Sequence, residues 1–161
     1  MSSLNYNLFI PDKYLEVIRA LFECKGCIFG GAVRDFIRNE IPKDLDVSVY
    51  DHKRFYDILD SLGFIVDENN RSTMIKDDII IEVCELDNEE VRVEINVSPD
   101  FDVNTLAWDG DNIFNYWNPD FDITNIISNI KNKSAEKIRP TNKRMEKMRS
   151  KGWLILEPSL Y

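Results

Sequence analysis

Two aspartates one residue apart, Asp44 and Asp46, lie in a segment in which apolar and polar residues alternate, DLDVSV. Alternate side chains of a β-strand point to the same face of a sheet, so these carboxylates are expected to project together. Two like charges at this separation are costly unless a cation lies between them, and oxygen ligands suit Mg²⁺ or Mn²⁺. The pattern therefore predicts a divalent metal site. A solvated strand face is the alternative, and the neighbouring residues decide between the two.

A pair of glycines, Gly30 and Gly31, stands between a short apolar segment, CIF, and a segment with helical spacing, AVRDFIRN. Glycines at a strand-to-helix turn allow a phosphate to approach the backbone, and the N–H groups at the start of a helix bind anions. Arg34, about one helical turn further on, can offer its guanidinium group to a phosphate. With the paired aspartates, these residues favour a site for nucleotide phosphates bridged by a metal ion.

The elements that must position these side chains follow from hydrophobic periodicity and turn residues. Asn39 is expected to close a helix, and Asp100 to cap a short helix at 101–108. The other helices are expected at 11–23, 32–39, 51–62, 121–130 and 141–151. Strands are expected at 27–30, 44–51, 64–68, 72–76, 78–85, 90–98 and 112–117, with an extended segment at 153–156. This order predicts an α+β domain in which helices pack on one face of a mixed, mainly antiparallel sheet.

The chain has 161 residues, of which 43% are hydrophobic and 30% charged. This fits a single domain, with a core at about 11–118 and a basic helical extension at about 121–161. No apolar run is long enough to span a membrane, and the N-terminus lacks a signal-peptide pattern. The odd count of three cysteines fits a reducing, cytoplasmic compartment. Cys24 and Cys27 form a C-x-x-C pair, for which a structural role is preferred over a redox role because a lone pair is weak evidence.

The net charge of −9 is unevenly distributed along the chain. Residues 131–151 contain nine Lys or Arg and two Glu, so this segment carries +7 and the rest of the chain −16. A basic segment can bind RNA phosphates even when the rest of a protein repels nucleic acid. It can equally pack against the acidic body of its own chain or form a solvated helix face, and the sequence slightly favours these structural roles.

The segment GGAVRDFIRNEIPKDLDVSV, from Gly30 to Val49, resembles the signature of class II nucleotidyltransferases. These are the CCA-adding enzymes and bacterial poly(A) polymerases of the polymerase-beta-like superfamily. Their pattern is G-G-x-V-R-D followed about eight residues later by K-D-x-D, and this chain matches it without a gap. The resemblance implies the polymerase-beta-like nucleotidyltransferase fold, with Asp44 and Asp46 as catalytic metal ligands and with Arg34 against the triphosphate.

A second segment, SPDFDVNTLAWDG at 98–110, resembles the R-R-D-F-T-x-N-A-L-A-Y-D segment of the same family. The resemblance implies that Asp100 and Asn104 help to hold the incoming nucleotide. Ser98 and Pro99 stand where the family has two arginines, which bears on nucleotide selectivity and on activity.

The resemblance also implies a third carboxylate on a strand beside the two aspartates. Glu94 is preferred as this third catalytic and metal-binding residue, because its segment, VRVEINV, alternates cleanly and leads directly into the second match. Glu82, in the segment IIIEVCE, is the competing candidate.

These residues predict a nucleotidyltransferase that uses Mg²⁺ or Mn²⁺ to transfer a nucleotide from an NTP to an acceptor. An RNA 3′ end, such as that of a tRNA, is the first candidate acceptor, and the chain is expected to be the catalytic head without the tRNA-gripping domains of CCA-adding enzymes. Two alternatives remain open. One is a nucleotide-binding protein that kept the fold without catalysis, and the other is transfer to a protein or small molecule. Trp108, Tyr116 and Trp117 are assigned to the core rather than to base stacking.

Overall fold

The computed structural model describes residues 3–95 and 98–158. The helices are α1 (Leu15–Glu23), α2 (Gly31–Ile37), α3 (His52–Ser61), α4 (Ile123–Lys131) and α5 (Asn142–Ser150), with 3₁₀ turns η1 (Asp12–Tyr14) and η2 (Asp102–Asn104). The strands are β1 (Ser3–Asn5), β2 (Gly26–Phe29), β3 (Leu45–Val49), β4 (Ile65–Asp67), β5 (Asn70–Lys76), β6 (Ile79–Glu85), β7 (Leu106–Trp108), β8 (Asn112–Asn115), β9 (Ser134–Glu136) and β10 (Leu154–Leu156). The fold is therefore α+β, as the sequence predicts.

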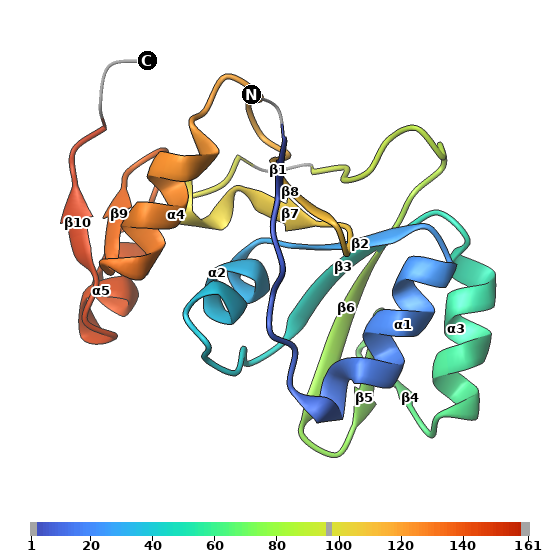
Figure 1. The fold of residues 1–161 in the computed structure, drawn as a ribbon. Coiled ribbons are helices and arrows are strands. Elements are labelled where there is room, and N and C mark those ends of the chain that lie inside the picture. Colours follow the sequence, from blue (N-terminus) through green and yellow to red (C-terminus); the bar gives the residue numbers. More distant parts are fainter. Residues whose placement is uncertain (1–2, 96–97, 159–161) are drawn as a thin grey trace.

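Eight of these strands form one mixed sheet, in the order β1-β8-β7-β2-β3-β6-β5-β4. Neighbouring strands are antiparallel except for β3 and β6, which run parallel in the middle of the sheet. Strands β9 and β10 form a separate parallel pair, and Figure 1 shows this pair beside α4 and α5, away from α1 and α3. The mainly antiparallel sheet confirms the expected fold class.

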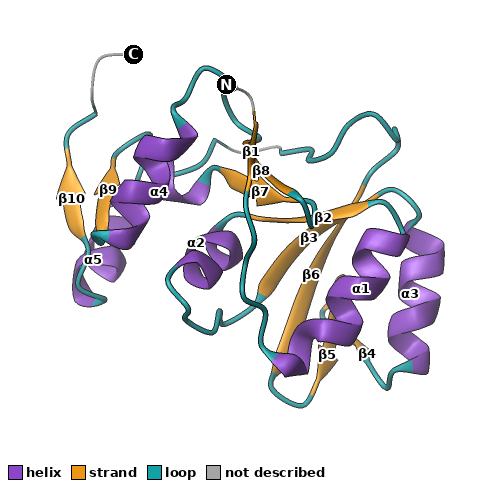
Figure 2. Cartoon of the chain, in the orientation of Figure 1, coloured by secondary structure: helices purple, strands orange, loops and turns teal. Residues whose placement is uncertain are grey.

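The core forms where α1, α2 and α3 pack against the sheet (Figure 2). Alternation along β3 buries Leu45, Val47 and Val49 completely or nearly so, and their cross-strand partners on β6 include the buried Ile81 and Val83. Because side chains alternate between the two faces of a strand, this register turns the intervening polar residues of β3 and β6 to the opposite face. The hydrophobic pattern thus fixes the direction in which the acidic side chains of these strands point.

The connection from β2 to α2 makes a tight turn at Gly30, whose φ of 76° lies in the left-handed region that favours glycine. The Gly30 N–H donates to the carbonyl of Leu106 on β7, which ties the turn to the sheet. At the other end of α2, Asn39 has a φ of 57°, so the prediction that Asn39 closes this helix is confirmed.

The strand predicted at 90–98 is wrong for its described part, since residues 91–95 form no strand; Asn96 and Val97 lie outside the described residues. The physical reason is that β6 already pairs with β3 on one side and with β5 on the other, which leaves no edge for a further strand. Instead the segment crosses the sheet face opposite the helices, where the Ser48 hydroxyl donates to the Arg92 carbonyl and the Cys84 thiol to the Glu94 carbonyl.

Other departures from the predicted elements are small. The helix predicted at 101–108 is the single 3₁₀ turn η2 followed by strand β7. Strands β1 and β9, each three residues long, were not predicted. Within the described part of the chain, no helix is long and apolar enough to cross a bilayer.

Candidate active site

A cavity of about 1090 Å³ lies between the β2–α2 turn, the start of β3 and the C-terminal helix α5. Its lining contains residues from both segments that the sequence singled out, and also residues of the basic C-terminal segment. Seven predicted site residues line it together: Gly30, Gly31, Arg34, Asp44, Asp46, Asp100 and Asn104. The structure therefore brings these residues to one place, although they are up to seventy-four positions apart in the chain.

The acidic side of the cavity is formed by Asp44, Asp46 and Glu82. Asp46 on β3 lies directly opposite Glu82 on β6, and their carboxyl groups share a hydrogen bond. Burial raises the pKa of Asp46, and the hydrogen bond and negative charge of Glu82 raise it further. Burial likewise raises the pKa of Asp44, with a second contribution from Glu82. Three carboxylates thus gather where the sequence pattern of Asp44 and Asp46 placed only two.

This geometry favours Glu82 over Glu94 as the third carboxylate of the candidate site. Glu94 is exposed, lies in the loop that crosses the sheet near Cys84, and does not line the cavity. Glu82 does line it, because the parallel pairing of β3 with β6 sets Glu82 beside Asp46. The clean alternation around Glu94 was a misleading signal, since no strand forms there.

Arg34 projects from α2 and is only 8% exposed. Its Nε donates to Asp35 at 2.9 Å, and its Nη1 donates to Oδ1 of Asn104 at 2.8 Å. A Cβ atom at Gly31 would stand 3.4 Å from Nη2 of Arg34, so a side chain there would lie against the guanidinium group. The two bonds hold Arg34 in place, and the missing side chain of Gly31 leaves the guanidinium group open toward the turn.

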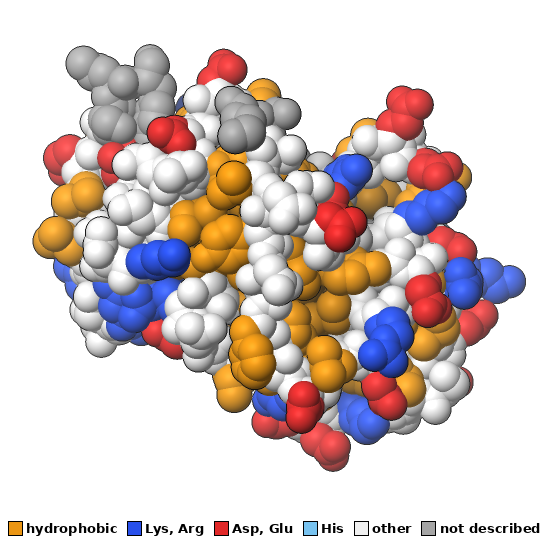
Figure 3. Space-filling model, in the orientation of Figure 1, with side chains coloured by type: hydrophobic (Ala, Val, Ile, Leu, Met, Phe, Trp, Pro, Cys, Tyr) orange, Lys and Arg blue, Asp and Glu red, His pale blue; other side chains and the backbone are white. Residues whose placement is uncertain are grey.

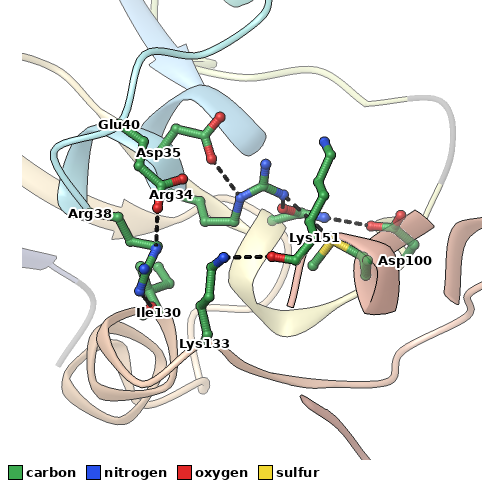
Figure 4. A network of polar contacts seen from close by, with 10 residues as sticks. Arg34, Asp35, Arg38, Glu40, Asp100, Ile130, Lys133 and Lys151 are labelled. Carbon is green, nitrogen blue, oxygen red and sulfur yellow. Dashed lines mark hydrogen bonds and ion pairs between the residues drawn. The ribbon is translucent and has the colours of Figure 1, made fainter. Parts of the chain in front are cut away.

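The hydrogen bonds of Arg34 continue into the second segment as far as Asp100 (Figure 4), and from there into α5. Asn104 donates from Nδ2 to Asp100 at 2.8 Å, and the other carboxylate oxygen of Asp100 accepts from Nε of Arg144 at 2.7 Å. The backbone carbonyl of Asp100 also accepts from the N–H groups of Ile138 and Arg139. Asp100 therefore joins the two predicted segments to the C-terminal part of the chain.

The side of the cavity opposite the carboxylates is basic. The cations that line it are Arg34, Lys43, Lys133, Arg139, Arg144, Lys147 and Lys151. Trp153, which follows α5, is 6% exposed, and its ring lies 5.6 Å from the guanidinium carbon of Arg34. Sequence reasoning did not assign Lys147, Lys151 or Trp153 to a site. For the two lysines the available signal was their place in the basic segment, which could not tell the cavity face of α5 from its solvent face.

The aromatic residues and cysteines have mainly structural surroundings. Trp108 is buried, as predicted, and its indole N–H donates to the Tyr6 carbonyl. Tyr116 is half-buried and lines the cavity, and its hydroxyl donates to the Asn104 carbonyl, whereas Trp117 is 39% exposed and the core prediction for it is wrong. The three cysteines are free, and burial raises the pKa of Cys27 to about 11. These surroundings favour the structural role of the C-x-x-C pair.

The carboxylates present fit a hard divalent cation in chemical type. Asp44, Asp46 and Glu82 offer the oxygen ligands that Mg²⁺ and Mn²⁺ prefer, and two of the three are in direct contact. In residues 3–95 and 98–158, no three acidic, His or Cys side chains already have the arrangement of a complete metal-ligand set. The three carboxylates therefore lie in one cavity without the arrangement of a complete metal-binding site.

The architecture is that of a nucleotidyltransferase-like fold, and comparison with solved structures finds similar folds. A CCA-adding enzyme of Thermotoga maritima complexed with tRNA matches with a TM-score of 0.57 and 12% identity, over 98% of this chain and 43% of that chain. A tRNA-processing enzyme in an apo form matches with a TM-score of 0.56 and 16% identity, over 82% of this chain and 38% of that chain. A CCA-adding enzyme in complex with ATP matches with a TM-score of 0.52 and 16% identity, over 78% of this chain and 34% of that chain.

This chain spans less than half the length of these structural neighbours. At such identities the similarity establishes the fold alone. No family model matches the chain, and no curated protein matches it.

Proposed function

We propose that this chain is a metal-dependent nucleotidyltransferase that transfers a nucleotide from an NTP to an acceptor. One observation carries the proposal: a single cavity joins the glycine turn and Arg34 to a group of three carboxylates. The glycine turn and Arg34 suit phosphates, and the carboxylates suit a divalent cation. Nucleotidyl transfer needs both kinds of group at one place. The structural neighbours include CCA-adding enzymes with ATP, with CTP and with tRNA, which supports nucleotides as substrates and an RNA 3′ end as the first candidate acceptor.

The residues of this chain divide the work between them. Asp44, Asp46 and Glu82 would hold Mg²⁺ or Mn²⁺, which would supply charge neutralisation at the reacting phosphate and would lower the pKa of the attacking hydroxyl. Arg34, fixed by Asp35 and Asn104, donates to the triphosphate from a position that needs no reorganisation.

Asp100 and Asn104 act mainly through other residues. Their polar atoms are already used, Asp100 by Arg144 and Asn104 by Arg34. They therefore position the two arginines that face the nucleotide, and they differ in this respect from the direct nucleotide contact that the sequence resemblance implies.

A nucleotide-binding protein without catalysis is the second candidate. Ser98 and Pro99 line the cavity and carry no charge where the related pattern has two arginines. This candidate predicts NTP binding with no transfer to any acceptor.

Incubation with each labelled NTP, Mg²⁺ or Mn²⁺, and a panel of acceptors separates the candidates. The panel holds tRNA lacking its 3′ end, an oligoribonucleotide and unrelated proteins. We expect transfer to RNA by the wild type and none by Asp44→Ala/Asp46→Ala. A matched control, Asp57→Ala/Asp60→Ala, removes two exposed acids of α3 and should keep activity. NTP binding without transfer to any acceptor would contradict the catalytic proposal.

A further inference from the structure

The cavity is lined by both acidic and basic side chains, only some of which form ion pairs with each other. Three carboxylates of the lining already form ion pairs within the protein. Asp35 pairs with Arg34, and Asp100 pairs with Arg144. Glu40 pairs with Arg38, which is not part of the lining. This leaves Asp44, Asp46 and Glu82 on the sheet side. Facing them from α5 are Lys147 and Lys151, and neither forms an ion pair with a carboxylate of the described residues.

Helix α5 presents two different faces, although nearly all of its charges are positive. Its basic residues at 143, 147, 149 and 151 are all exposed, but only Lys147 and Lys151, which are one turn apart, line the cavity; Lys143 and Arg149 do not. Figure 3 shows Lys and Arg side chains gathered on the part of the surface where α5 lies. One helix therefore carries a cavity pair and a solvent pair of equal charge.

The position of the cavity pair is fixed by packing. Met148, between the two lysines, is 2% exposed and belongs to the core. Arg144 holds the start of the helix to Asp100, and the carbonyl of Lys151 accepts a hydrogen bond from Nζ of Lys133. Figure 4 shows the Lys151 side chain extending beside the guanidinium group of Arg34. The packing of Met148 and these hydrogen bonds thus place both lysines at the cavity without a close ion pair to hold either one.

We propose that Lys147 and Lys151 bind the triphosphate of the nucleotide, as a second group of phosphate ligands from outside both motif segments. This inference rests on the proposed function, because it assigns part of the same substrate. The carboxylates would hold the metal ion, and the lysines contact phosphate oxygens of the nucleotide. The uncharged Ser98 and Pro99 leave this task to cations that come from α5.

The surroundings favour a compact polyphosphate over an RNA backbone at these two lysines. Burial lowers the pKa of Lys151, and the positive charges of Lys147, Arg34 and Arg144 lower it further against the opposing charge of Asp35, so cations outweigh anions around this side chain. Arg34, Lys147 and Lys151 line the same cavity as Gly31, where the clustered oxygens of one triphosphate can contact them together. An RNA backbone would instead follow the outer face of α5, where Lys143 and Arg149 lie.

Titration of the whole chain with ATP, AMP and inorganic tripolyphosphate in the presence of Mg²⁺ tests this assignment. We expect Lys147→Gln/Lys151→Gln to weaken binding of ATP and of tripolyphosphate by about tenfold or more, and that of AMP by less. Lys143→Gln/Arg149→Gln removes the same charge from the same helix and should change each affinity by less than about twofold. Equal thermal unfolding midpoints for the two double variants show that the fold is intact.

The outcomes separate the two proposals. ATP binding that weakens as expected, without transfer to any acceptor, supports the lysine assignment and contradicts only the catalytic function. ATP binding that is equal in the two double variants overturns the lysine assignment alone. Fluorescent tRNA provides the third comparison: loss of tRNA binding in Lys147→Gln/Lys151→Gln with unchanged ATP affinity assigns the lysines to the acceptor and also overturns the inference.

Discussion

Asp102 is completely buried in η2, directly between the two residues of the second segment that organise the cavity. Its Oδ1 accepts from the backbone N–H of Glu136 at 2.8 Å and its Oδ2 from the side-chain amide of Asn129 at 2.9 Å. Burial raises the pKa of Asp102 from 3.8 to about 6, against the effect of these two hydrogen bonds and with a further rise from the charge of Glu136. The folded protein therefore holds a proton here more tightly than the unfolded chain.

The sign and size of the effect on stability follow from this difference. A carboxyl whose folded pKa is raised favours folding at low pH, and this advantage is lost as the pH rises from the unfolded value of 3.8 through the folded value of about 6. The rise corresponds to about 3 kcal/mol. Replacement of Asp102 by Asn removes the ionisation. It keeps both hydrogen bonds if the half-buried amide of Asn129 turns over to present its oxygen.

We therefore expect Asp102→Asn to have about the wild-type free energy of unfolding at pH 4 and to exceed it by about 3 kcal/mol at pH 7. Urea unfolding of both proteins at pH 4, 5, 6 and 7 measures this difference. Asp57→Asn, which removes an exposed aspartate of α3, controls for the change in net charge and should follow the wild type. A difference that stays constant with pH, or a less stable Asp102→Asn at pH 7, would refute the reasoning.

Two further predictions concern the third carboxylate and the packing of the sheet. Glu82→Gln should lower nucleotidyl transfer by about a hundredfold or more, as loss of an interaction with transition-state charge does, while Glu94→Gln should keep it within about twofold; equal losses in a steady-state assay would restore Glu94 to the site. Gly26→Ala should destabilise the fold by about 2 kcal/mol or more in urea unfolding, because its Cβ would stand 2.7 Å from the backbone carbonyl of Ser48 and would overpack the sheet. An unchanged urea midpoint would show that β2 and β3 can move apart there.

The sequence predicted best the parts of the fold that local patterns decide. Alternation at 44–51 and helical spacing at 11–23 and 51–62 reflect which side chains are buried, and burial is visible in the sequence. The failure at 90–98 has a different cause. Its alternation is as clean as that of a strand, yet β6 had both edges occupied, and the occupancy of a sheet edge depends on the whole topology. Three-residue strands such as β1 and β9 are too short to show any period.

The same limit explains why the sequence favoured Glu94 whereas the geometry favours Glu82. The sequence offered two glutamates with similar flanks, and proximity in the chain to the second segment decided for Glu94. In the structure, strands β3 and β6 are parallel neighbours, and their register sets Glu82 opposite Asp46. Because opposite residues on adjacent strands share a face of the sheet, the two side chains lie together. No local pattern states that a strand beginning more than thirty residues later pairs parallel with β3.

The basic segment shows why counting charges could not settle its role. From the sequence, RNA binding and packing on the acidic body were alternative roles for the whole segment. In the structure Arg144 pairs with Asp100, Lys143 and Arg149 face solvent, and Lys147 and Lys151 line the cavity. Adjacent turns of one helix thus serve as anchor, solvated face and proposed phosphate site. Since these roles differ by the 100° rotation per residue of a helix, they separate only when the face of α5 that packs on the core is known, and the burial of Met148 identifies that face.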